Sequence, residues 1–302
     1  MEDSVRHQTR TVAARRFLQE ITIEIGRQDP THFRMIDEHL KSISLQEGPV
    51  FYEILKLIYS YFREANVSTF QLATDYLRMV GDMRREYGYF ILYGKYSCKS
   101  QAEADEKVYS RPEIMSYYMN GLILSQLLWR HHFEMIRYFR NTVQQQVKRY
   151  VDVLDIGAGH GLYSYFVREH IPVNTIDIVD ISSESLKMTQ DMIGSNSINY
   201  ILSDINNFWS QDKYDLIILG EVLEHLDNPL DTLVHAKEML REGGVIWLTV
   251  PTKAPAIDHV YLFRSKTGVF SMVRKAGLKV NAYLDLRASR ITHLIGAFCV
   301  KK

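Results

Sequence analysis

The central segment of this chain reads Val153-Leu-Asp-Ile-Gly-Ala-Gly-His-Gly161. A short β-branched run leads into a turn with glycine at alternate positions, and a helical pattern begins near Leu162. Glycines leave the backbone open to close approach by a ligand, and the first turn of the following helix offers free amide donors. The segment therefore predicts a strand, a ligand-binding turn and a helix within a parallel α/β sheet.

The spacing of the glycines and the acid before them argue against a dinucleotide as the ligand. A dinucleotide-binding turn has the spacing G-x-G-x-x-G, whereas this turn reads G-x-G-x-G and follows Asp155. A pyrophosphate would be repelled by that carboxylate. The turn is therefore expected to bind a ligand other than a dinucleotide.

Acids also stand where the following predicted strands end, at the edge where sheets of this class bind ligands. Asp180 is predicted to accept hydrogen bonds from both hydroxyls of a ribose. Asp177 is a competing candidate for this role. Asp180 is preferred because it lies at the exit of the predicted strand, where ligands bind. Asp204 is predicted to accept from an adenine amino group beside Ile205, and Glu221 follows the fourth strand.

The part of the chain after Tyr150 alternates short β-branched runs with helical segments, as a parallel α/β sheet does. The link 288–292 between the last two runs is too short for a crossover, which needs about a dozen residues, so these runs are expected to form a hairpin with one antiparallel strand. The predicted strands are Val151–Ile156, Asn174–Val179, Asn199–Leu202, Tyr214–Leu219, Val245–Val250, Lys279–Leu286 and Leu294–Val300.

The first half of the chain has helical periodicity and no strand signal. Helix starts are predicted at Asp29-Pro30, at Ser68-Thr-Phe-Gln71 and at Ser110-Arg-Pro-Glu113. One long helix is expected from Ser110 to about Gln146, running into the first strand. We place an all-α domain at residues 1–148 and a sheet domain at residues 149–302.

Composition excludes several classes of partner. Lys and Arg together number 36, as do Asp and Glu, so a zero formal charge argues against nucleic acid and anionic membranes. Cys98 and Cys299 are too few for a disulfide framework or a thiolate metal site, and the consecutive His131 and His132 face different sides of a helix. No metal is expected. The chain has no apolar run resembling a signal peptide or a membrane span, so a cytoplasmic location is expected.

The region from Val151 to Lys302 resembles a class I S-adenosylmethionine-dependent methyltransferase domain. The matching pieces are Asp155–Gly161, Val179–Ser182, Ser203-Asp204 and Tyr214–Leu226. This resemblance implies a Rossmann-like sheet of seven strands with the last antiparallel, preceded here by the all-α domain, and S-adenosylmethionine as cofactor. It also implies that Gly157, Gly159 and Gly161 pass under the methionine part of the cofactor, that Asp180 holds the ribose and Asp204 the adenine. We include Asp155, Ala158, Ile181, Ile205 and Glu221 among the cofactor-binding residues.

The atom that receives the methyl group determines which residues are catalytic, because methyl transfer is an in-line displacement that needs alignment and, for some acceptors, deprotonation. Gly220-Glu-Val-Leu223 stands where methyltransferases of nucleobase or glutamine amino groups have Asn/Asp-Pro-Pro-Tyr, which disfavours nucleic acid as the acceptor. The segment Glu221–Leu226 resembles the form common in methyltransferases of small molecules and natural products. The pair Glu224-His225 recurs in this family, and we predict a structural role for His225.

The candidates for catalysis lie in the loop 251–264 and in the first half of the chain. His259 is the leading candidate base, with a backbone hydrogen bond as the alternative role. Arg264 is a candidate for binding a substrate carboxylate, or is solvated. The hydroxyl of Tyr117 or Tyr118 is a candidate contact for cofactor or acceptor, with core packing as the alternative.

These features favour O-methylation of a small-molecule or peptide natural product. Methyl-ester formation on the C-terminal carboxylate of a ribosomally made peptide is an alternative, as is transfer to nitrogen or carbon. A catalytically silent partner subunit is a third hypothesis, which the intact glycine turn disfavours. The helical domain is expected to form a lid over the acceptor, and a homodimer through that domain is a possible assembly.

Overall fold

The computed structural model describes residues 2–147, 150–211 and 213–302, with side chains from residue 10 onward. These residues form two compact units, the first made of the chain up to Gly81 together with 116–137, and the second of 82–115 together with 138–302. The second unit thus takes in residues 82–115, which the predicted division at residue 148 left in the helical domain. The predicted boundary itself, between Lys148 and Arg149, lies outside the described residues.

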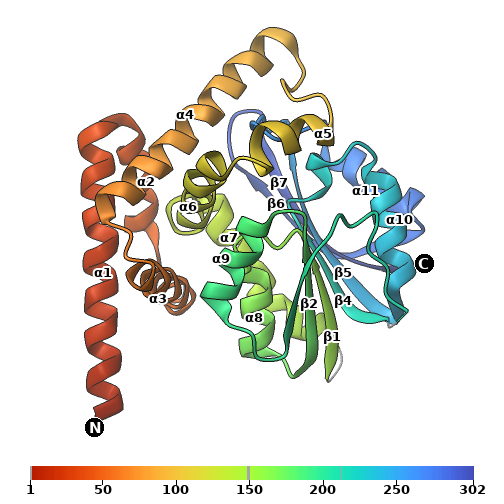
Figure 1. Cartoon of the computed structure of the whole chain (residues 1–302), viewed down its shortest axis with the longest axis horizontal. Helices are drawn as coiled ribbons and strands as arrows, with labels where there is room; N and C mark the ends of the chain where they lie inside the picture. Colours follow the sequence, from red (N-terminus) through yellow and green to blue (C-terminus); the bar gives the residue numbers. More distant parts are fainter. Residues whose placement is uncertain (1, 148–149, 212) are drawn as a thin grey trace. The chain divides into compact units, whose positions relative to one another are not determined.

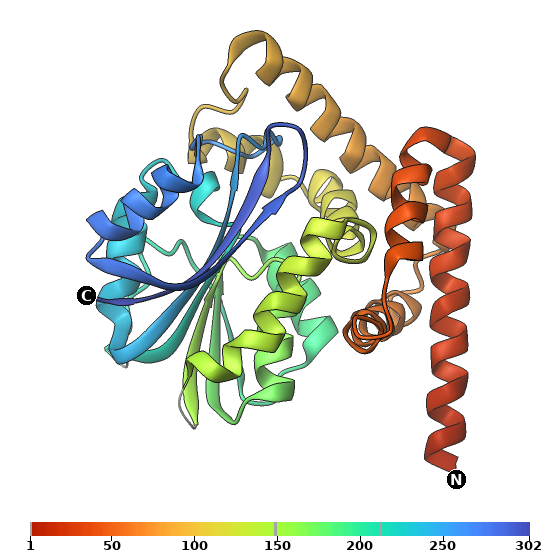
Figure 2. The same ribbon diagram turned by 180° about the vertical axis from the view of Figure 1, so that it is seen from behind.

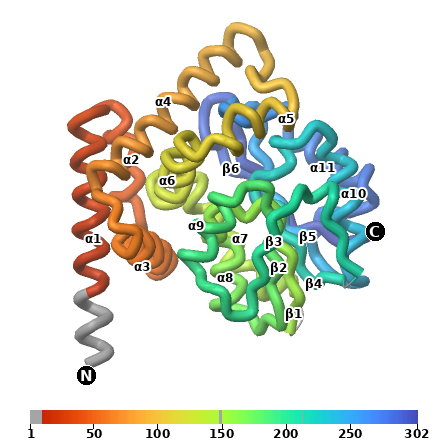
Figure 3. Tube along the Cα trace, viewed as in Figure 1, coloured from red at the N-terminus to blue at the C-terminus, as the bar shows by residue number. Residues whose placement is uncertain are grey.

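The described residues of the first unit are helical, as predicted (Figure 3). Asp29 caps its helix by accepting from the His32 amide at 2.9 Å, and Ser68 accepts from the Gln71 amide at 3.1 Å. The Ser110 hydroxyl donates to the Asp105 carboxylate at 2.9 Å, and the helix predicted to start there begins at Pro112. The helices are α1 (Glu2–Gln28), α2 (Pro30–Ser42), α3 (Gly48–Glu64), the part of α4 (Thr69–Tyr93) up to Gly81, and the parts of α6 (Pro112–Leu128) and α7 (Arg130–Gln146) that fall within 116–137.

The single long helix predicted from Ser110 to Gln146 is wrong, because the chain breaks at Trp129 into α6 and α7. Polar side chains fill the junction. The Ser125 hydroxyl donates back to the Leu122 carbonyl at 2.7 Å, a bond that bends helices, and lies 2.8 Å from His132 Nδ1. The Trp129 indole donates to the Tyr76 hydroxyl at 2.6 Å. The helix that precedes the first strand is therefore α7, and Tyr117 and Tyr118 belong to the earlier helix α6.

The second unit contains a seven-stranded sheet in the order β3-β2-β1-β4-β5-β7-β6, which confirms all seven predicted strands (Figure 1). Only β7 runs antiparallel to its neighbours β5 and β6, so the last two strands form the expected hairpin at one edge. The strands are β1 (Val151–Ile156), β2 (Val173–Asp180), β3 (Ile198–Leu202), β4 (Tyr214–Gly220), β5 (Leu240–Thr252), β6 (Leu278–Arg287) and β7 (His293–Lys301).

Helices cover both faces of this sheet. On one face the second part of α7 packs with α8 (Leu162–His170), and Phe139 lies 5.3 Å from the fully buried Trp247 of β5 (Figure 2). On the other face α10 (Pro229–Met239) and α11 (Lys266–Lys275) bury apolar side chains against β4 and β5. Truncating a large core side chain such as Trp247 typically lowers the stability of a protein by about 3–5 kcal/mol. Packing of this strength between the helices and the sheet holds the ends of the strands in place.

Short segments complete the second unit. The helix α9 (Ser183–Ile193) connects β2 to β3, and the one-turn helix η2 (Leu223–His225) follows β4. The segments α5 (Gln101–Ala104) and η1 (Asp105–Tyr109) lie in the part of the chain before α6. No helix among the described residues is long and apolar enough to span a membrane.

Candidate active site at the carboxyl edge of the sheet

The glycine turn after β1 is open to a ligand at Gly159. This residue has a φ of +57°, and a Cβ built there would meet no atom within 4 Å. Gly161, with a φ of +71°, differs because its Cβ would lie 2.5 Å from the Thr189 side chain. The side chain of Thr189 also donates to the Gly159 carbonyl at 2.8 Å. Thr189 of α9 thus fixes one side of the turn. On the other side Gly159 leaves open space, which a side chain would fill.

Asp180 at the end of β2 lies directly beside this turn. Its carboxylate accepts from the Gly159 amide at 3.4 Å and from the Ser182 amide at 2.8 Å, and only 8% of the residue is exposed. Burial raises the pKa of Asp180 to about 6, although these amide bonds oppose the shift. Its competitor Asp177 accepts instead from the hydroxyl of Tyr214 at 2.6 Å, so its carboxylate is engaged within the sheet.

The other predicted cofactor residues line the same edge. Asp155 is buried at the end of β1, accepts from the Ser164 hydroxyl at 2.6 Å, and has its pKa raised to about 7 by burial. Asp204 accepts from the Asn206 amide at 2.8 Å. Ile205 is buried, whereas 41% of Ile181 is exposed and leaves an apolar side chain beside Asp180.

The segment after β4 lies next to the glycine turn, because β1 and β4 are neighbours and a Cβ on Gly157 would lie 2.8 Å from Val222. Glu221 has a φ of +55°, and its amide donates to the side chain of Thr249 at 2.9 Å. Burial, reinforced by the Asp258 carboxylate, raises the pKa of Glu221 to about 7. The side chain three residues on, Glu224, has no exposed surface, and neither of its carboxylate oxygens has a hydrogen-bond partner.

The loop after β5 packs against this segment through the Glu224 main chain. The Glu224 carbonyl accepts from the amides of both Val260 and Tyr261, each at 2.8 Å. The preceding residue, His259, is buried, and its Nδ1 donates to the Ala254 carbonyl at 2.6 Å. Burial lowers the pKa of His259 to about 4, which keeps the ring neutral at pH 7.

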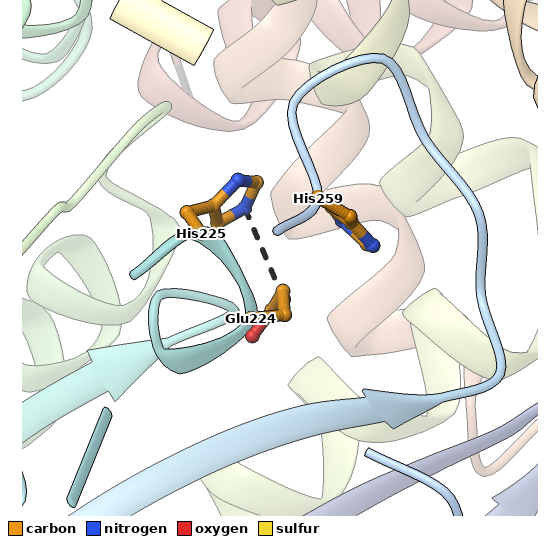
Figure 4. Close-up of side chains that lie close together, drawn as sticks. All are labelled: Glu224, His225 and His259. Carbon is orange, nitrogen blue, oxygen red and sulfur yellow. Dashed lines mark ion pairs between the residues drawn. The ribbon is translucent and has the colours of Figure 1, made fainter. Parts of the chain in front are cut away.

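Glu224, His225 and His259 form a cluster in which one ligand atom from each residue lies within 4.8 Å of the others. The two imidazole rings are 4.8 Å apart and nearly perpendicular, and His225 Nε2 is 3.9 Å from Glu224 Oε1. Figure 4 shows Glu224 and His225 on one short turn, with His259 on the separate loop beside it. The Tyr109 hydroxyl lies 2.9 Å from His225 Nδ1 and donates to Asp258.

The predicted catalytic residues differ in where they lie. His259 stands in this cluster, whereas Arg264 lies on the exposed end of the same loop. Tyr117 and Tyr118 are buried in the first unit, where the Arg78 guanidinium stands 3.9 Å from the Tyr117 ring centre. Their catalytic roles stay predictions.

Several residues of the cluster were not predicted as functional. We predicted a structural role for His225 and assigned none to Glu224, Asp258 or Tyr109, and the structure places all of them with His259. A signal was present in the sequence: the pairs Glu224-His225 and Asp258-His259 follow adjacent predicted strands at their carboxyl ends.

A protein-family model described as a methyltransferase domain matches residues 130–280. Similar proteins of known name include malonyl-[acyl-carrier protein] O-methyltransferase 2 of Ilyobacter polytropus, 34% identical over 32% of this chain and 37% of that protein. The mitochondrial ubiquinone biosynthesis O-methyltransferase of Candida albicans is 28% identical over 32% of this chain. The matched region covers 31% of the length of this second relative. This chain therefore spans only about a third of the length of either relative.

Solved structures agree on the fold. The N-methyltransferase NodS of Bradyrhizobium japonicum in complex with S-adenosyl-L-homocysteine matches 68% of this chain with a TM-score of 0.52 and 14% identity. A SAM-dependent methyltransferase of Leishmania major matches 66% of this chain with a TM-score of 0.53 and 17% identity. At such identities the likeness is one of architecture.

Proposed function

This chain belongs to the family of methyltransferase domains that the match over residues 130–280 defines, and from this premise we propose that it transfers a methyl group to an oxygen atom of a small-molecule acceptor. The cofactor is S-adenosylmethionine, which supplies a methyl group bound to a sulfonium and therefore open to nucleophilic attack. The protein must hold the acceptor oxygen in line with that methyl group and remove its proton where one is present.

The residues at the β1 and β2 ends fit this cofactor. Asp180 offers a carboxylate that two vicinal hydroxyls of a ribose can share, and Gly159 leaves room for the ligand to lie against the backbone. Asp204 can accept from an amino group, with the apolar side chains of Ile181 and Ile205 beside the base. We assign these residues to the adenosine part, and the glycine turn with Asp155 and Ala158 to the methionine part.

One observation carries the choice of oxygen as the acceptor atom: two imidazoles and a carboxyl group stand together next to the glycine turn. A hydroxyl has to lose its proton to become an effective nucleophile, and this cluster holds the groups that can take up or displace that proton. The names of the two relatives, both O-methyltransferases, support the same choice.

A hydroxyl acceptor also suits the charge of the site better than a carboxylate does. Burial and the neighbouring carboxyl groups already raise the pKa of Glu221 and Glu224, and an acceptor carboxylate would bring a further negative charge to this edge. This disfavours the methyl ester of a peptide as the product. We keep a hydroxylated natural product as the proposed acceptor class, and a peptide as its alternative.

The experiment is a methyl-transfer screen with a cofactor labelled with ¹³C in the methyl group. Hydroxylated, amine and carboxylate compounds and a cell extract are offered separately, and release of S-adenosylhomocysteine is followed by mass spectrometry. The expected product carries a methyl ether, which its ¹³C chemical shift distinguishes from N-methyl, C-methyl and methyl-ester groups. A labelled methyl on nitrogen or carbon would refute O-methylation, and failure to bind S-adenosylhomocysteine in calorimetry would refute the proposed function as a whole.

A further inference from the structure

The buried carboxylate of Glu224 is the least satisfied group of the candidate active site. It has no exposed surface and no hydrogen-bond partner for either oxygen. Buried carboxylates ordinarily accept several hydrogen bonds or face a cation, because an unpaired charge in the protein interior costs several kcal/mol. The nearest ligand atoms are imidazole nitrogens of His225 and His259, which in their neutral form offer lone pairs.

The hydrogen bonds of both histidines leave the same nitrogen available. His259 Nδ1 lies 2.6 Å from the Ala254 carbonyl, and because a carbonyl only accepts, that nitrogen carries the proton. His225 Nδ1 likewise faces the Asp258 carbonyl at 3.2 Å. In both rings Nε2 is then the unprotonated nitrogen. A second nitrogen held by a backbone carbonyl is the usual arrangement of histidines that bind metals, since it fixes the ring and its tautomer.

The surrounding charges favour a cation at the same place. Glu221 stands three residues before Glu224, and the Asp258 carboxylate lies 3.5 Å from His225 Nδ1, so three carboxyl groups gather around the cluster. A positive charge beside the three carboxylates would relieve the repulsion between them. The loop that carries His259 is already fixed by the two amide bonds to the Glu224 carbonyl, so the ligand atoms need little rearrangement.

We propose that Glu224, His225 and His259 bind a divalent transition-metal cation, with Zn²⁺ as the best match. Two imidazoles and one carboxylate suit Zn²⁺ and the neighbouring first-row cations, whereas Mg²⁺ and Ca²⁺ prefer sets made of oxygen atoms alone. Three protein ligands also leave a position open for an exogenous oxygen, as in catalytic zinc sites. This inference rests on the proposed function, to which it adds the means of deprotonation.

The chemistry at that open position is balanced without any further reactant. An acceptor hydroxyl bound to the cation would become more acidic, and its proton would pass to the Glu221 carboxylate, which follows β4 three residues before Glu224. The oxygen then forms a bond to the methyl carbon while the bond from that carbon to sulfur breaks, and the electron pair stays on sulfur. Glu221 afterwards returns the proton to water.

The test measures metal binding directly on protein purified without a polyhistidine tag and stripped with a chelator. Zn²⁺ is titrated by calorimetry, and Co²⁺ is added as a spectroscopic probe, because its visible absorption reports four-coordinate binding. The variants are Glu224→Gln and His259→Ala, and the control is His293→Ala. His293 also pairs with a carboxylate, Asp285 at 2.7 Å, and stands outside the cluster.

We expect one Zn²⁺ per wild-type chain and a loss of about 100-fold in affinity in Glu224→Gln and His259→Ala, with the control unchanged. Equal Zn²⁺ affinity in wild type and both cluster variants, or an equal loss in His293→Ala, would overturn the inference. S-adenosylhomocysteine affinity is measured on the same samples. If the wild type binds that ligand and no cation, the metal site alone is refuted, and variants that keep the ligand affinity are shown to be folded.

Discussion

The carboxyl edge of the sheet offers different chemical groups at its two ends, one formed by β1 and β2 and the other by β4 and β5. At β1 and β2 the groups available to a ligand are mainly backbone groups, and the Asp180 carboxylate accepts from the amides of Gly159 and Ser182. At β4 and β5 they are ionisable side chains, among them a Glu224 carboxylate without any hydrogen bond. Burial raises pKa values at both ends, but Asp180 accepts from two backbone amides, whereas Glu224 has no hydrogen-bond partner and neighbouring carboxylates raise its pKa further.

This contrast indicates that one end of the edge serves to bind the cofactor and the other serves the transfer reaction. Satisfied backbone groups bind a ligand with little reorganisation, while crowded, poorly solvated acids and bases are typical of places where protons move. We therefore expect substitutions at β1 and β2 to change cofactor affinity, and substitutions at β4 and β5 to change the rate of methyl transfer. The following experiments separate these two effects.

Replacing His259 tests the reacting end. His259→Ala removes one of the two imidazoles to which we assign the proposed deprotonation of the acceptor, and we expect kcat to fall about 1000-fold, or roughly 4 kcal/mol in the barrier. Affinity for S-adenosylhomocysteine should stay within about 2-fold of wild type, as measured by calorimetry beside the rate of its release. A nearly normal rate would instead indicate an acceptor that is already ionised, such as a carboxylate.

Replacing Asp180 tests the binding end. Asp180→Ala removes the carboxylate proposed to hold two ribose hydroxyls, and charge-assisted hydrogen bonds of this kind contribute about 1.5–3 kcal/mol each. We expect S-adenosylhomocysteine to bind about 100-fold more weakly in calorimetry, with Zn²⁺ affinity unchanged. Undiminished ligand binding would contradict the assignment of Asp180, and an equal loss of Zn²⁺ would show that the two ends do not act separately.

Two neighbouring glycines separate folding from binding within the turn. In Gly161→Ala the new Cβ would meet Thr189 at 2.5 Å in a left-handed backbone, so we expect a loss of about 2–3 kcal/mol in the free energy of unfolding. In Gly159→Ala the Cβ meets nothing, so we expect a loss of only about 1 kcal/mol together with weaker cofactor binding. Urea denaturation and calorimetry measure both. Equal stability losses in the two variants would contradict the open space above Gly159.

The pH dependence of cofactor binding gives the smallest effect. In the proposed binding mode the ribose hydroxyls require an ionised Asp180, and with a pKa of about 6 only about one chain in eleven has it ionised at pH 5. Binding should therefore strengthen as pH rises through 6. We expect S-adenosylhomocysteine to bind about 10-fold more weakly at pH 5 than at pH 7.5, and Asp180→Asn to remove most of this difference. A flat profile in the wild type would contradict the raised pKa.

The fold and the binding end could be predicted from local sequence pattern. The strands contain short runs rich in β-branched and other apolar residues, and the turn at Gly157–Gly161 is continuous in the chain, so both can be recognised without knowing any distant contact. The missing crossover between β6 and β7 was enough to predict the antiparallel strand. The break at Trp129 was not visible, because it depends on the side-chain bonds of Ser125, Tyr76 and His132.

The reacting end could not be predicted in the same way, because its members come from three separate segments. Tyr109 precedes α6, His225 follows β4 and His259 follows β5, and only the folded chain brings them together. The resemblance to a family added to the difficulty, since the pair Glu224-His225 recurs there and this recurrence favours a structural role for His225. The burial of an unpaired carboxylate is a property of packing and has no signature in sequence.

The loop after β5 is fixed by main-chain groups, since the Glu224 carbonyl accepts from the amides of Val260 and Tyr261. Hydrogen bonds between main-chain atoms do not depend on which side chains the loop carries. Residues such as Ile257 and Leu262 can therefore be exchanged while the loop stays where it is. This makes the segment a starting point for libraries that aim to redirect the enzyme to new acceptors without rebuilding its scaffold.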